Sequence, residues 1–413
     1  MRSRYLPDNP LRLLTEGYGW LPDLRRQAGA DTVRIRVPGL PALALCGPAA
    51  ARYFYDDVHV RRRGALPGPV KHTLFGEGSV HGLDGEPHRV RKAMFLSLMT
   101  SAGIGSLVSR AGEAWQAAAG AWRERAAIGL FEEAGRVLTR AVCGWAGVPV
   151  GDADLPALAA DLQAMVDGFG TLGPRHWRAR RARQRREAWL TELVTARRAT
   201  DNGRPVSALD VVARHRDTTG ELLPAQVAAV ELLNLLRPTV AVSWFVAFAG
   251  HALHRWPAHR RRLRTGDPAF ARAFSHEIRR FYPFAPFVGG RAVTDLSWQG
   301  ERLPAGGLVL LDIYGQNHHP ELWPDPYRFH PDRFLDRPVG RFELIAQGGG
   351  DPLVGHRCPG EALADSLLQA LAVRLARLDY RLPPQDLRIP LRRIPTRPNS
   401  GVQLELGPHH KVR

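Results

Sequence analysis

A single cysteine near the C-terminus, Cys358, carries the clearest chemical signal in the sequence. It lies in the segment QGGGDPLVGHRCPGE, where glycines at 348, 349, 350 and 355 let the backbone approach a flat ligand closely. A helix is expected to begin near Gly360, and both its N-terminus and Arg357 favour the thiolate form of the cysteine. Buried structural cysteines are commoner in general, but they seldom lie in a polar, glycine-rich loop. The pattern therefore indicates that Cys358 is a ligand to a flat cofactor.

Arg237 is the second candidate, because it interrupts the apolar stretch AAVELLNLLRPTVAVSWFVAFAG at residues 228–250. An unpaired guanidinium in apolar surroundings costs several kcal/mol, so it must reach water or a carboxylate. The only acid in the stretch is Glu231, six residues away and on a different face of a helix. Pro238 removes a helical hydrogen bond and clashes with the carbonyl of Asn234, which opens the helix there. An internal salt bridge is the ordinary role of such an arginine, but these two features favour a carboxylate from outside the chain.

The composition limits the kind of protein that holds these residues. A chain of 413 residues, 44% of them hydrophobic, can bury a large core. Cys46, Cys143 and Cys358 are odd in number and show no CxxC spacing, which argues against a disulfide framework, a structural zinc site and covalently attached haem. Because the sequence shows neither a signal peptide nor a charge-free apolar run of about 18 residues, we expect a cytoplasmic protein without a membrane span.

The net charge of +17, from 57 Lys and Arg against 40 Asp and Glu, favours anionic partners. The densest basic run, Arg175 to Trp189, interleaves arginine with tryptophan, as contacts to single-stranded nucleic acid require. No nucleic-acid-binding motif accompanies the run, so we interpret it as a solvated helix face. A basic nucleic-acid-binding protein or a haem sensor is the alternative from a different class.

Helical periodicity dominates the chain and must position these candidates. Apolar residues recur every three or four positions over the segments 86–125, 130–146, 154–169, 176–200, 224–254, 268–282 and 360–377. Strand-like runs are short and occur in DTVRIRVPGLPALALCG near the start and in RAVTDLSWQGERLPAGGLVLLDIYG later, with a turn at Gly300. No internal repeat and no long linker is present. We therefore predict one mainly α domain with small β-sheets.

Two further motifs precede the cysteine loop. HEIRR places Glu277 and Arg280 three residues apart, where they can pair on one helix face, and FHPDRF supplies Arg333. Followed by the cysteine loop, these motifs resemble the haem-thiolate, or cytochrome P450, superfamily, in which such residues form a Glu-Arg-Arg lock behind the haem. The resemblance covers residues 1–413. It implies a single cytochrome P450 domain with non-covalent haem b and Cys358 as the proximal, metal-binding ligand.

The resemblance also implies which residues contact the haem. The haem propionates need cationic or imidazole donors. HRVRK places two candidates one helical turn apart, RRRGALPG supplies an arginine, and a histidine precedes the cysteine by two residues. Together with the residue that opens the cysteine loop, the expected haem contacts beside Cys358 are His88, Lys92, Arg62, His356 and Gln347.

The long central helix departs from the usual monooxygenase pattern. NLLRPTVAV lacks an acid followed by an alcohol, the pair that relays protons to bound oxygen, and the cysteine loop is long and begins with Gln347 in place of an aromatic residue. With FYPFAPF, LFGEGSVHGLDG and GFGTLGPRHW, these departures resemble the bacterial fatty-acid peroxygenases. Those enzymes use hydrogen peroxide to hydroxylate fatty acids at the α or β carbon or to decarboxylate them to 1-alkenes. The resemblance implies that no redox partner is obligatory.

For this chain the resemblance implies a long- or medium-chain fatty acid whose carboxylate is held by Arg237, next to Pro238. The anchored carboxylate then replaces the missing acid as general acid and base toward hydrogen peroxide. Because only the first carbons reach the oxidising centre, attack is expected at Cα or Cβ. The tail is expected along apolar residues for which core packing is the alternative role: Phe75, Val166, Phe169, Ala241, Phe284 and Phe287.

His81, in SVHGLDG, falls where this branch has glutamine or histidine near the haem. A histidine there can donate a proton and favour loss of carbon dioxide, and a structural histidine is the equal alternative. We expect mixed products, hydroxy fatty acids together with some 1-alkene. The alternative enzyme is a conventional monooxygenase that depends on NAD(P)H and a ferredoxin.

Overall fold

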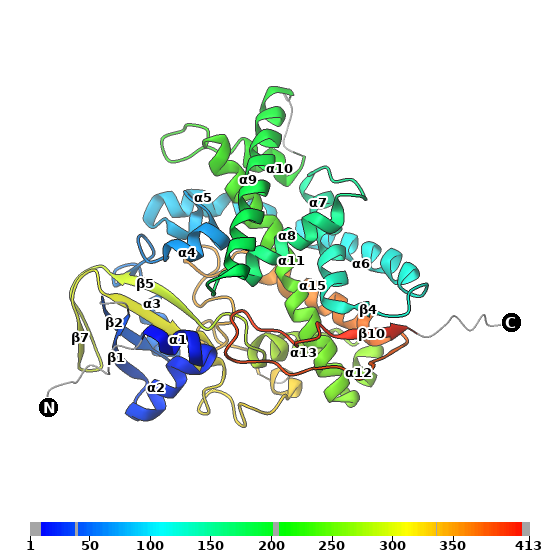
Figure 1. The fold of residues 1–413 in the computed structure, drawn as a ribbon. Coiled ribbons are helices and arrows are strands. Elements are labelled where there is room, and N and C mark those ends of the chain that lie inside the picture. Colours follow the sequence, from blue (N-terminus) through cyan, green and yellow to red (C-terminus); the bar gives the residue numbers. More distant parts are fainter. Residues whose placement is uncertain (1–9, 38–39, 201–205, 336, 407–413) are drawn as a thin grey trace.

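A computed structural model describes residues 10–37, 40–200, 206–335 and 337–406. Helices make up most of these residues, and a five-stranded sheet lies at one side of the molecule, at the left of Figure 1. The predicted fold class, mainly α with small β-sheets, is confirmed. Both ends of the predicted domain, residues 1–9 and 407–413, lie outside the described residues. The expected lack of a signal peptide rests partly on residues 1–9. Pro38 and Gly39, within the first strand-like run, lie outside them as well.

Most of the predicted helices are present with bounds close to those expected. They are α7 Leu130–Ala146, α8 Leu155–Asp167, α9 Pro174–Thr200, α11 Ala225–Arg255, α13 Pro268–Phe281 and α15 Glu361–Arg377. The helix predicted over 86–125 is instead two helices bent by 57°, α5 Gly85–Leu98 and α6 Ser101–Trp122. The break is explained by Thr100, whose side chain caps α6 by accepting a hydrogen bond from the Gly103 N–H.

Shorter helices connect these elements, and periodicity does not reveal them because each has few turns. They are α1 Pro10–Glu16, α2 Trp20–Ala28, α3 Pro48–Phe54, α4 Gly68–Val70, α10 Ala208–Ala213, α12 Pro257–Arg264 and α14 Ile313–Asn317. The single turns are η1 Gly17–Gly19, η2 Lys71–Phe75, η3 Val80–Gly82 and η4 Pro331–Phe334. Of these, η2 is π-helical, a geometry that often marks a functional segment, and it ends at Phe75.

The central helix α11 runs through the core and contacts α7, α8, α9 and α15 (Figure 1). Residues 228–250 are all buried except Pro238, which is exposed. The expected interruption at Pro238 is wrong, because α11 continues through it as one 31-residue helix. Within the described ranges, α11 alone is long and apolar enough to cross a membrane as a single helix, and the bent pair α5 and α6 passes the same test together. Since 94% of the most apolar window of α11 is buried inside the protein, α11 is a core helix.

The two predicted strand-like runs meet in one sheet with the order β1-β2-β8-β5-β3. The pairs are antiparallel except β2 and β8, which are parallel. The predicted turn at Gly300 joins β6 to β7, and a third small sheet has the order β4-β10-β9. The strands are β1 Thr32–Val37, β2 Leu40–Leu45, β3 Val60–Arg61, β4 Ile128–Gly129, β5 Phe287–Ala292, β6 Leu296–Trp298, β7 Glu301–Leu303, β8 Leu308–Asp312, β9 Tyr380–Arg381 and β10 Gln403–Leu406.

Candidate active site

The predicted lock of two arginines on one glutamate is formed. Arg280 donates to both carboxylate oxygens of Glu277, at 2.7 and 2.8 Å, and neither side chain is exposed. Arg333 Nε lies 3.4 Å from Glu277 Oε2, and the backbone N–H of His330 donates to Glu277 Oε1 at 2.7 Å. The lock therefore ties α13 to the turn η4. A buried ion pair of this kind serves to hold one geometry more than to add stability.

The cysteine loop is held in place before α15 begins. The backbone N–H of Cys358 donates to the carbonyl of Gln347 at 3.0 Å. Lys92 on α5 reaches the loop from outside, where its Nζ donates to the carbonyl oxygens of Gly355 and, at 2.8 Å, Arg357. The ammonium of Lys92 thus supports the loop, and its predicted contact with a haem propionate stays a prediction. Gln347 Oε1 is buried and has no hydrogen-bond partner among the described residues, so its contact with a cofactor stays a prediction.

The thiol of Cys358 sits in surroundings that favour the neutral form. Burial raises its pKa, although the N–H of Gly360 and the positive charges of Lys92 and Arg279 lower it. The Arg357 guanidinium is paired with Glu361, with Nε 2.5 Å from Glu361 Oε2, and this pairing is the main cause that raises its pKa, so its predicted effect on the Cys358 thiolate stays a prediction. A coordinated metal ion deprotonates a thiol outright. The loop thus suits a cysteine whose thiolate is stabilised mainly by a metal.

Three other predicted haem contacts form one cluster. The rings of His88 and His356 are stacked with centroids 3.9 Å apart, and the Arg62 guanidinium lies 4.1 Å from the ring centroid of Phe54. Arg62 Nη1 is buried and has no hydrogen-bond partner in the described part of the chain. Burial lowers the pKa of His88 to about 4 and that of His356 to about 2, with nearby positive charges adding to the effect. Two carboxylates border the cluster, since His356 Nε2 lies 3.4 Å from Asp84 Oδ1 and 3.8 Å from Asp57 Oδ1, but the unpaired donor of Arg62 suits an anionic group such as a propionate.

These observations show that the residues present fit haem. Pro238 is exposed in the middle of an otherwise buried helix, so this turn of α11 borders open space. Cys358 is near enough to Arg237, its neighbour in that helix, for a thiolate to raise the pKa of the arginine. The half-buried thiol of Cys358 and the unpaired donor of Arg62 supply what a thiolate-bound haem with propionates requires.

Arg237 is buried without a protein carboxylate to pair with. Only 3% of its surface is exposed, and among the described residues Nη1 has no hydrogen-bond partner and the side chain has no ion pair. The guanidinium carbon lies 5.6 Å from the ring centroid of Phe75. Glu231, the one acid nearby in sequence, is engaged by Arg91 at 2.8 Å and by Asn234 at 3.0 Å. The predicted internal alternative, a salt bridge to Glu231, is therefore absent.

His81 lies beside the same phenylalanine. The ring centroids of His81 and Phe75 are 4.1 Å apart, and Nδ1 is buried with no hydrogen-bond partner in the residues that the structure describes. Burial, together with the charges of Arg237 and Arg183, lowers the pKa of His81 to about 3. The imidazole is thus neutral at pH 7 and carries one N–H that it can donate. Burial and then the charge of Arg183 likewise lower the pKa of Arg237.

The other predicted substrate residues fall in different places. Ala241 is buried one turn beyond the arginine on α11, and Phe284 packs against an aromatic residue of that helix with ring centroids 5.1 Å apart. Val166 belongs to the main core on α8, and Phe169 follows that helix. Phe287 packs on the small core beside the five-stranded sheet. The contact of these residues with a fatty-acid tail stays a prediction.

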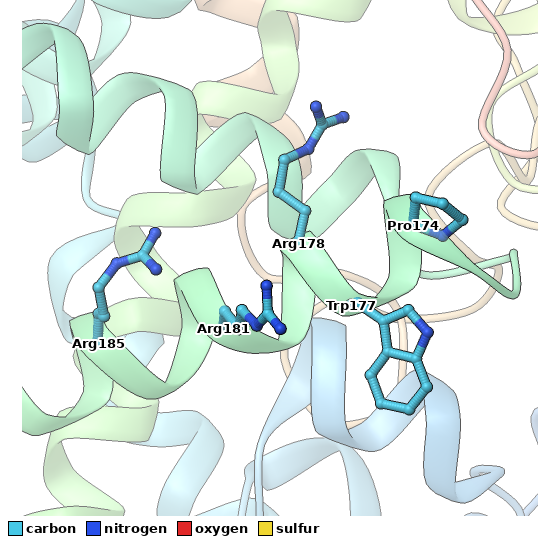
Figure 2. A pocket seen from close by; sticks show the side chains of 5 residues that line it. All are labelled: Pro174, Trp177, Arg178, Arg181 and Arg185. Carbon is cyan, nitrogen blue, oxygen red and sulfur yellow. The ribbon is translucent and has the colours of Figure 1, made fainter.

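The basic run at 175–189 lies within α9 and is only partly a solvated face. Arg178, Arg181 and Arg185 are exposed and line a shallow groove with Trp177, which is 54% exposed (Figure 2). Two of these three arginines also pair with carboxylates of α8. The outward-facing arginines of this run are thus exposed to solvent, and two of them also pair with carboxylates of α8.

Arg183, in the same run, is the candidate that the sequence analysis missed. Its side chain is only 2% exposed, and its charge acts on both Arg237 and His81. The signal was available, since Arg183 lies four or seven residues from buried positions of α9 (His176, Ala179 and Leu190) and so falls on its inner face. The abundance of arginine around it obscured that spacing.

Comparison with known proteins finds one family model that matches the C-terminal part of the chain and solved structures that match nearly all of it. A model of the cytochrome P450 family matches residues 269–400. The solved structure of a variant of cytochrome P450SP alpha (CYP152B1) is 40% identical with a TM-score of 0.93, and the match covers 97% of this chain and 98% of that one. The structure of ligand-free cytochrome P450 OleT is 33% identical with a TM-score of 0.93 and 96% of each chain covered. Other structures of these two proteins contain (R)-ibuprofen and arachidonic acid, respectively.

Curated relatives are more distant. The cyclooctat-9-en-7-ol 5-monooxygenase of Streptomyces melanosporofaciens is 25% identical over 371 residues, which are 82% of this chain and 79% of that protein. Cytochrome P450 4A11 of Homo sapiens is 32% identical over 132 residues, 32% of this chain and 25% of that protein. The likeness to the solved structures spans nearly the whole chain, whereas the likeness to the human protein is confined to about a third of it.

Proposed function

The chain belongs to the cytochrome P450 family, and we propose that it is a peroxygenase that oxidises fatty acids with hydrogen peroxide. It hydroxylates them at the α or β carbon and converts a part to 1-alkenes by loss of carbon dioxide. Support comes from P450SP alpha and OleT, which are 40% and 33% identical to this chain over nearly its whole length. The molecules bound in structures of those two proteins are carboxylic acids.

One observation carries the proposal: Arg237 is 3% exposed, yet its Nη1 has no hydrogen-bond partner among the described residues. A buried guanidinium without a protein carboxylate is a strong binding site for a carboxylate that arrives from outside. The half-buried phenyl ring of Phe75 and the buried methyl of Ala241 make the neighbouring surface apolar. A fatty acid has both the anionic head and the apolar tail that this arrangement accepts.

The anchored carboxylate takes over the proton transfers. Arg237 holds it where a conventional monooxygenase has its own acid, next to Pro238 on α11. The carboxylate takes a proton from one oxygen of hydrogen peroxide and returns it to the oxygen that leaves as water. Neutral His81 can donate its N–H to the substrate after Cβ has been attacked, which favours loss of carbon dioxide.

The position of the head group determines where the substrate is oxidised. Haem b, when bound through Cys358, supplies the oxidising chemistry. Arg62, His88 and His356 would hold its propionates, and Lys92 keeps the cysteine loop in place. With the carboxylate held by an arginine of the central helix, only the first carbons come within reach, so oxidation falls on Cα or Cβ.

The function is tested by incubating the haem-loaded protein with a mid-length fatty acid such as myristate. Hydrogen peroxide is the oxidant in one arm, and NADPH with a ferredoxin and its reductase in the other. Products are separated by mass spectrometry. We expect 2- and 3-hydroxy acids and a 1-alkene one carbon shorter in the peroxide arm. Products that form only in the NADPH arm would favour a conventional monooxygenase.

We also propose that the chain acts as one catalytic domain in the cytoplasm, without an obligatory redox partner, without nucleic acid and without a membrane span. The most apolar helix of the described residues supports this, because 94% of its apolar window is buried against other helices. Peroxide as oxidant removes the need for electron delivery.

A further inference from the structure

Arg183 on α9 is buried, yet only part of its hydrogen-bonding capacity is met. Its Nη1 donates to the carbonyl of Leu74 at 2.7 Å, and its Nε lies 2.5 Å from Glu187 Oε1. Its Nη2 is buried with no hydrogen-bond partner in the part of the chain that the structure describes. An arginine keeps its charge even when burial lowers its pKa, so a full positive charge lies inside the molecule at this point.

Arg183 lies against the backbone on both sides of Phe75. The Leu74 carbonyl that it holds precedes Phe75, and Gly76 follows it. Gly76 has a φ of +86°, and a Cβ at this position would overlap Arg183 Nη2, so only glycine allows the close approach. The ring of Phe75 in turn faces Arg237 at 5.6 Å. The contacts of Arg183 therefore hold the segment that covers the substrate arginine.

The charge of Arg183 reaches the same site. After burial, it is the largest cause that lowers the pKa of Arg237, and it also lowers the pKa of His81. Two positive charges near one site repel each other, and a carboxylate bound there relieves the repulsion. Glu187 offsets part of the charge from its outer side. The resulting field favours an anion over an uncharged lipid of the same length.

We infer that Arg183 is a second, positioning cation of the substrate site, which holds the Phe75 segment over Arg237 and selects carboxylates over uncharged head groups. Arg183 acts through Phe75 and through its field, without touching the substrate. The inference rests on the proposed function, since it concerns the same substrate carboxylate.

The test compares a charged and an uncharged ligand of one chain length. The haem-loaded protein is titrated with laurate and with dodecanol, and each dissociation constant is read from the shift of the haem absorption band. Arg183→Met removes the charge and keeps the length, so it should weaken laurate binding about tenfold and change dodecanol binding less than about twofold. Arg183→Lys keeps the charge and should retain most of the laurate affinity.

Glu187→Gln separates charge from structure, because it removes the acid that offsets Arg183. Laurate binding should be unchanged or tighter in this variant, in the opposite direction to Arg183→Met. Arg181→Met is the matched control, since Arg181 is an exposed arginine of the same helix and its loss lowers the net charge equally (Figure 2). This control should leave both dissociation constants unchanged.

A purely structural ion pair predicts a different outcome. Equal losses of laurate and dodecanol affinity in Arg183→Met, equal losses in Arg183→Met and Glu187→Gln, or an unchanged laurate affinity would each overturn the inference. Product formation by the wild type with peroxide is measured separately. Its absence contradicts the proposed function, whereas product formation together with unchanged selectivity in Arg183→Met contradicts the inference alone.

Discussion

At the scale of single residues, two buried groups lack what their chemistry needs from the protein. Arg237 is a cation without a protein anion, and Cys358 is a thiol whose pKa burial raises in the absence of a metal. We propose that each takes a partner from outside the chain, a substrate carboxylate for the first and the haem iron for the second. After burial, Arg183 and Glu231, a charge on Cys358 is a further influence on the pKa of Arg237, which supports one shared site for both partners.

Arg237→Ala should abolish the peroxide-dependent oxidation of fatty acids while haem stays bound. Removing one partner of a buried, hydrogen-bonded charge pair costs about 2–5 kcal/mol, so kcat/KM should fall by at least about 30-fold. Haem absorption and product formation are measured together. Arg178→Ala, on the exposed face of α9, is the control. Full activity of Arg237→Ala on the same acid would show that the carboxylate is held elsewhere.

His81→Gln should shift the products toward 3-hydroxy acids at the expense of 1-alkene. The neutral imidazole beside Phe75 has an unpaired Nδ1. Glutamine has no ring N–H that it could place at the same position. The ratio of alkene to hydroxy acid is measured by gas chromatography at equal conversion. An unchanged alkene fraction would remove His81 from the mechanism.

At the scale of elements, one helix and one loop carry most of the site. Helix α11 buries Arg237 and exposes Pro238 beside it, and the loop before α15 carries Cys358. Helices α13 and α5 brace that loop, through Arg279 paired with Glu361 and through Lys92. The site therefore depends on contacts between elements far apart in the sequence.

Glu277→Gln should destabilise this arrangement, because Arg280 would remain buried without its ion pair. Breaking a buried pair in this way costs about 3–5 kcal/mol. We expect a lower melting temperature and a smaller fraction of protein that retains haem after purification. Glu113→Gln on the exposed face of α6 is the control. Equal haem content in the two variants would mean that the lock plays no part in cofactor retention.

The long elements and the chemical motifs could be predicted from sequence because each has a local cause. Apolar spacing predicts α7, α11 and α15, and the spacing of Glu277 and Arg280 predicts their pair. The cap at Thr100 splits one predicted helix, since a single hydrogen bond outweighs a continuous apolar period. Strands of two residues, such as β3, exist only through their partners and have no local signal. The roles of Lys92 and Arg183 likewise depend on tertiary contacts.

At the scale of the whole molecule, buried histidines couple stability to pH. Burial, followed by the charge of Arg280, lowers the pKa of His318 to about 4, and His318 is 5% exposed. The unfolded chain takes up a proton at this residue below about pH 6.5, while the folded chain does so only below about pH 4. The stability contributed by the neutral ring is therefore complete above about pH 6.5 and is lost as the pH falls toward 4.

His318→Asn should flatten the dependence of stability on pH in that window. The wild-type side chain contributes on the order of 3 kcal/mol of pH-dependent stability between pH 6.5 and 4, and asparagine cannot take up the proton. The amide of asparagine can still donate to the Tyr314 carbonyl that His318 Nδ1 contacts at 2.9 Å. Midpoints of guanidinium unfolding are measured from pH 4 to 7. His254→Asn, an exposed site, should keep the wild-type slope.

The bracing of the cysteine loop bears on how the holoenzyme is assembled. Lys92 donates hydrogen bonds to two carbonyls of the loop, and Arg357 donates to the Gly350 carbonyl at 3.1 Å. The Cys358 N–H donates to the carbonyl of Gln347. Three anchors made by the polypeptide itself leave the loop little conformational freedom to lose. The metalloporphyrin can then bind after the chain has folded. Because the loop is already ordered, little of the binding free energy is lost to ordering it, and the affinity is higher.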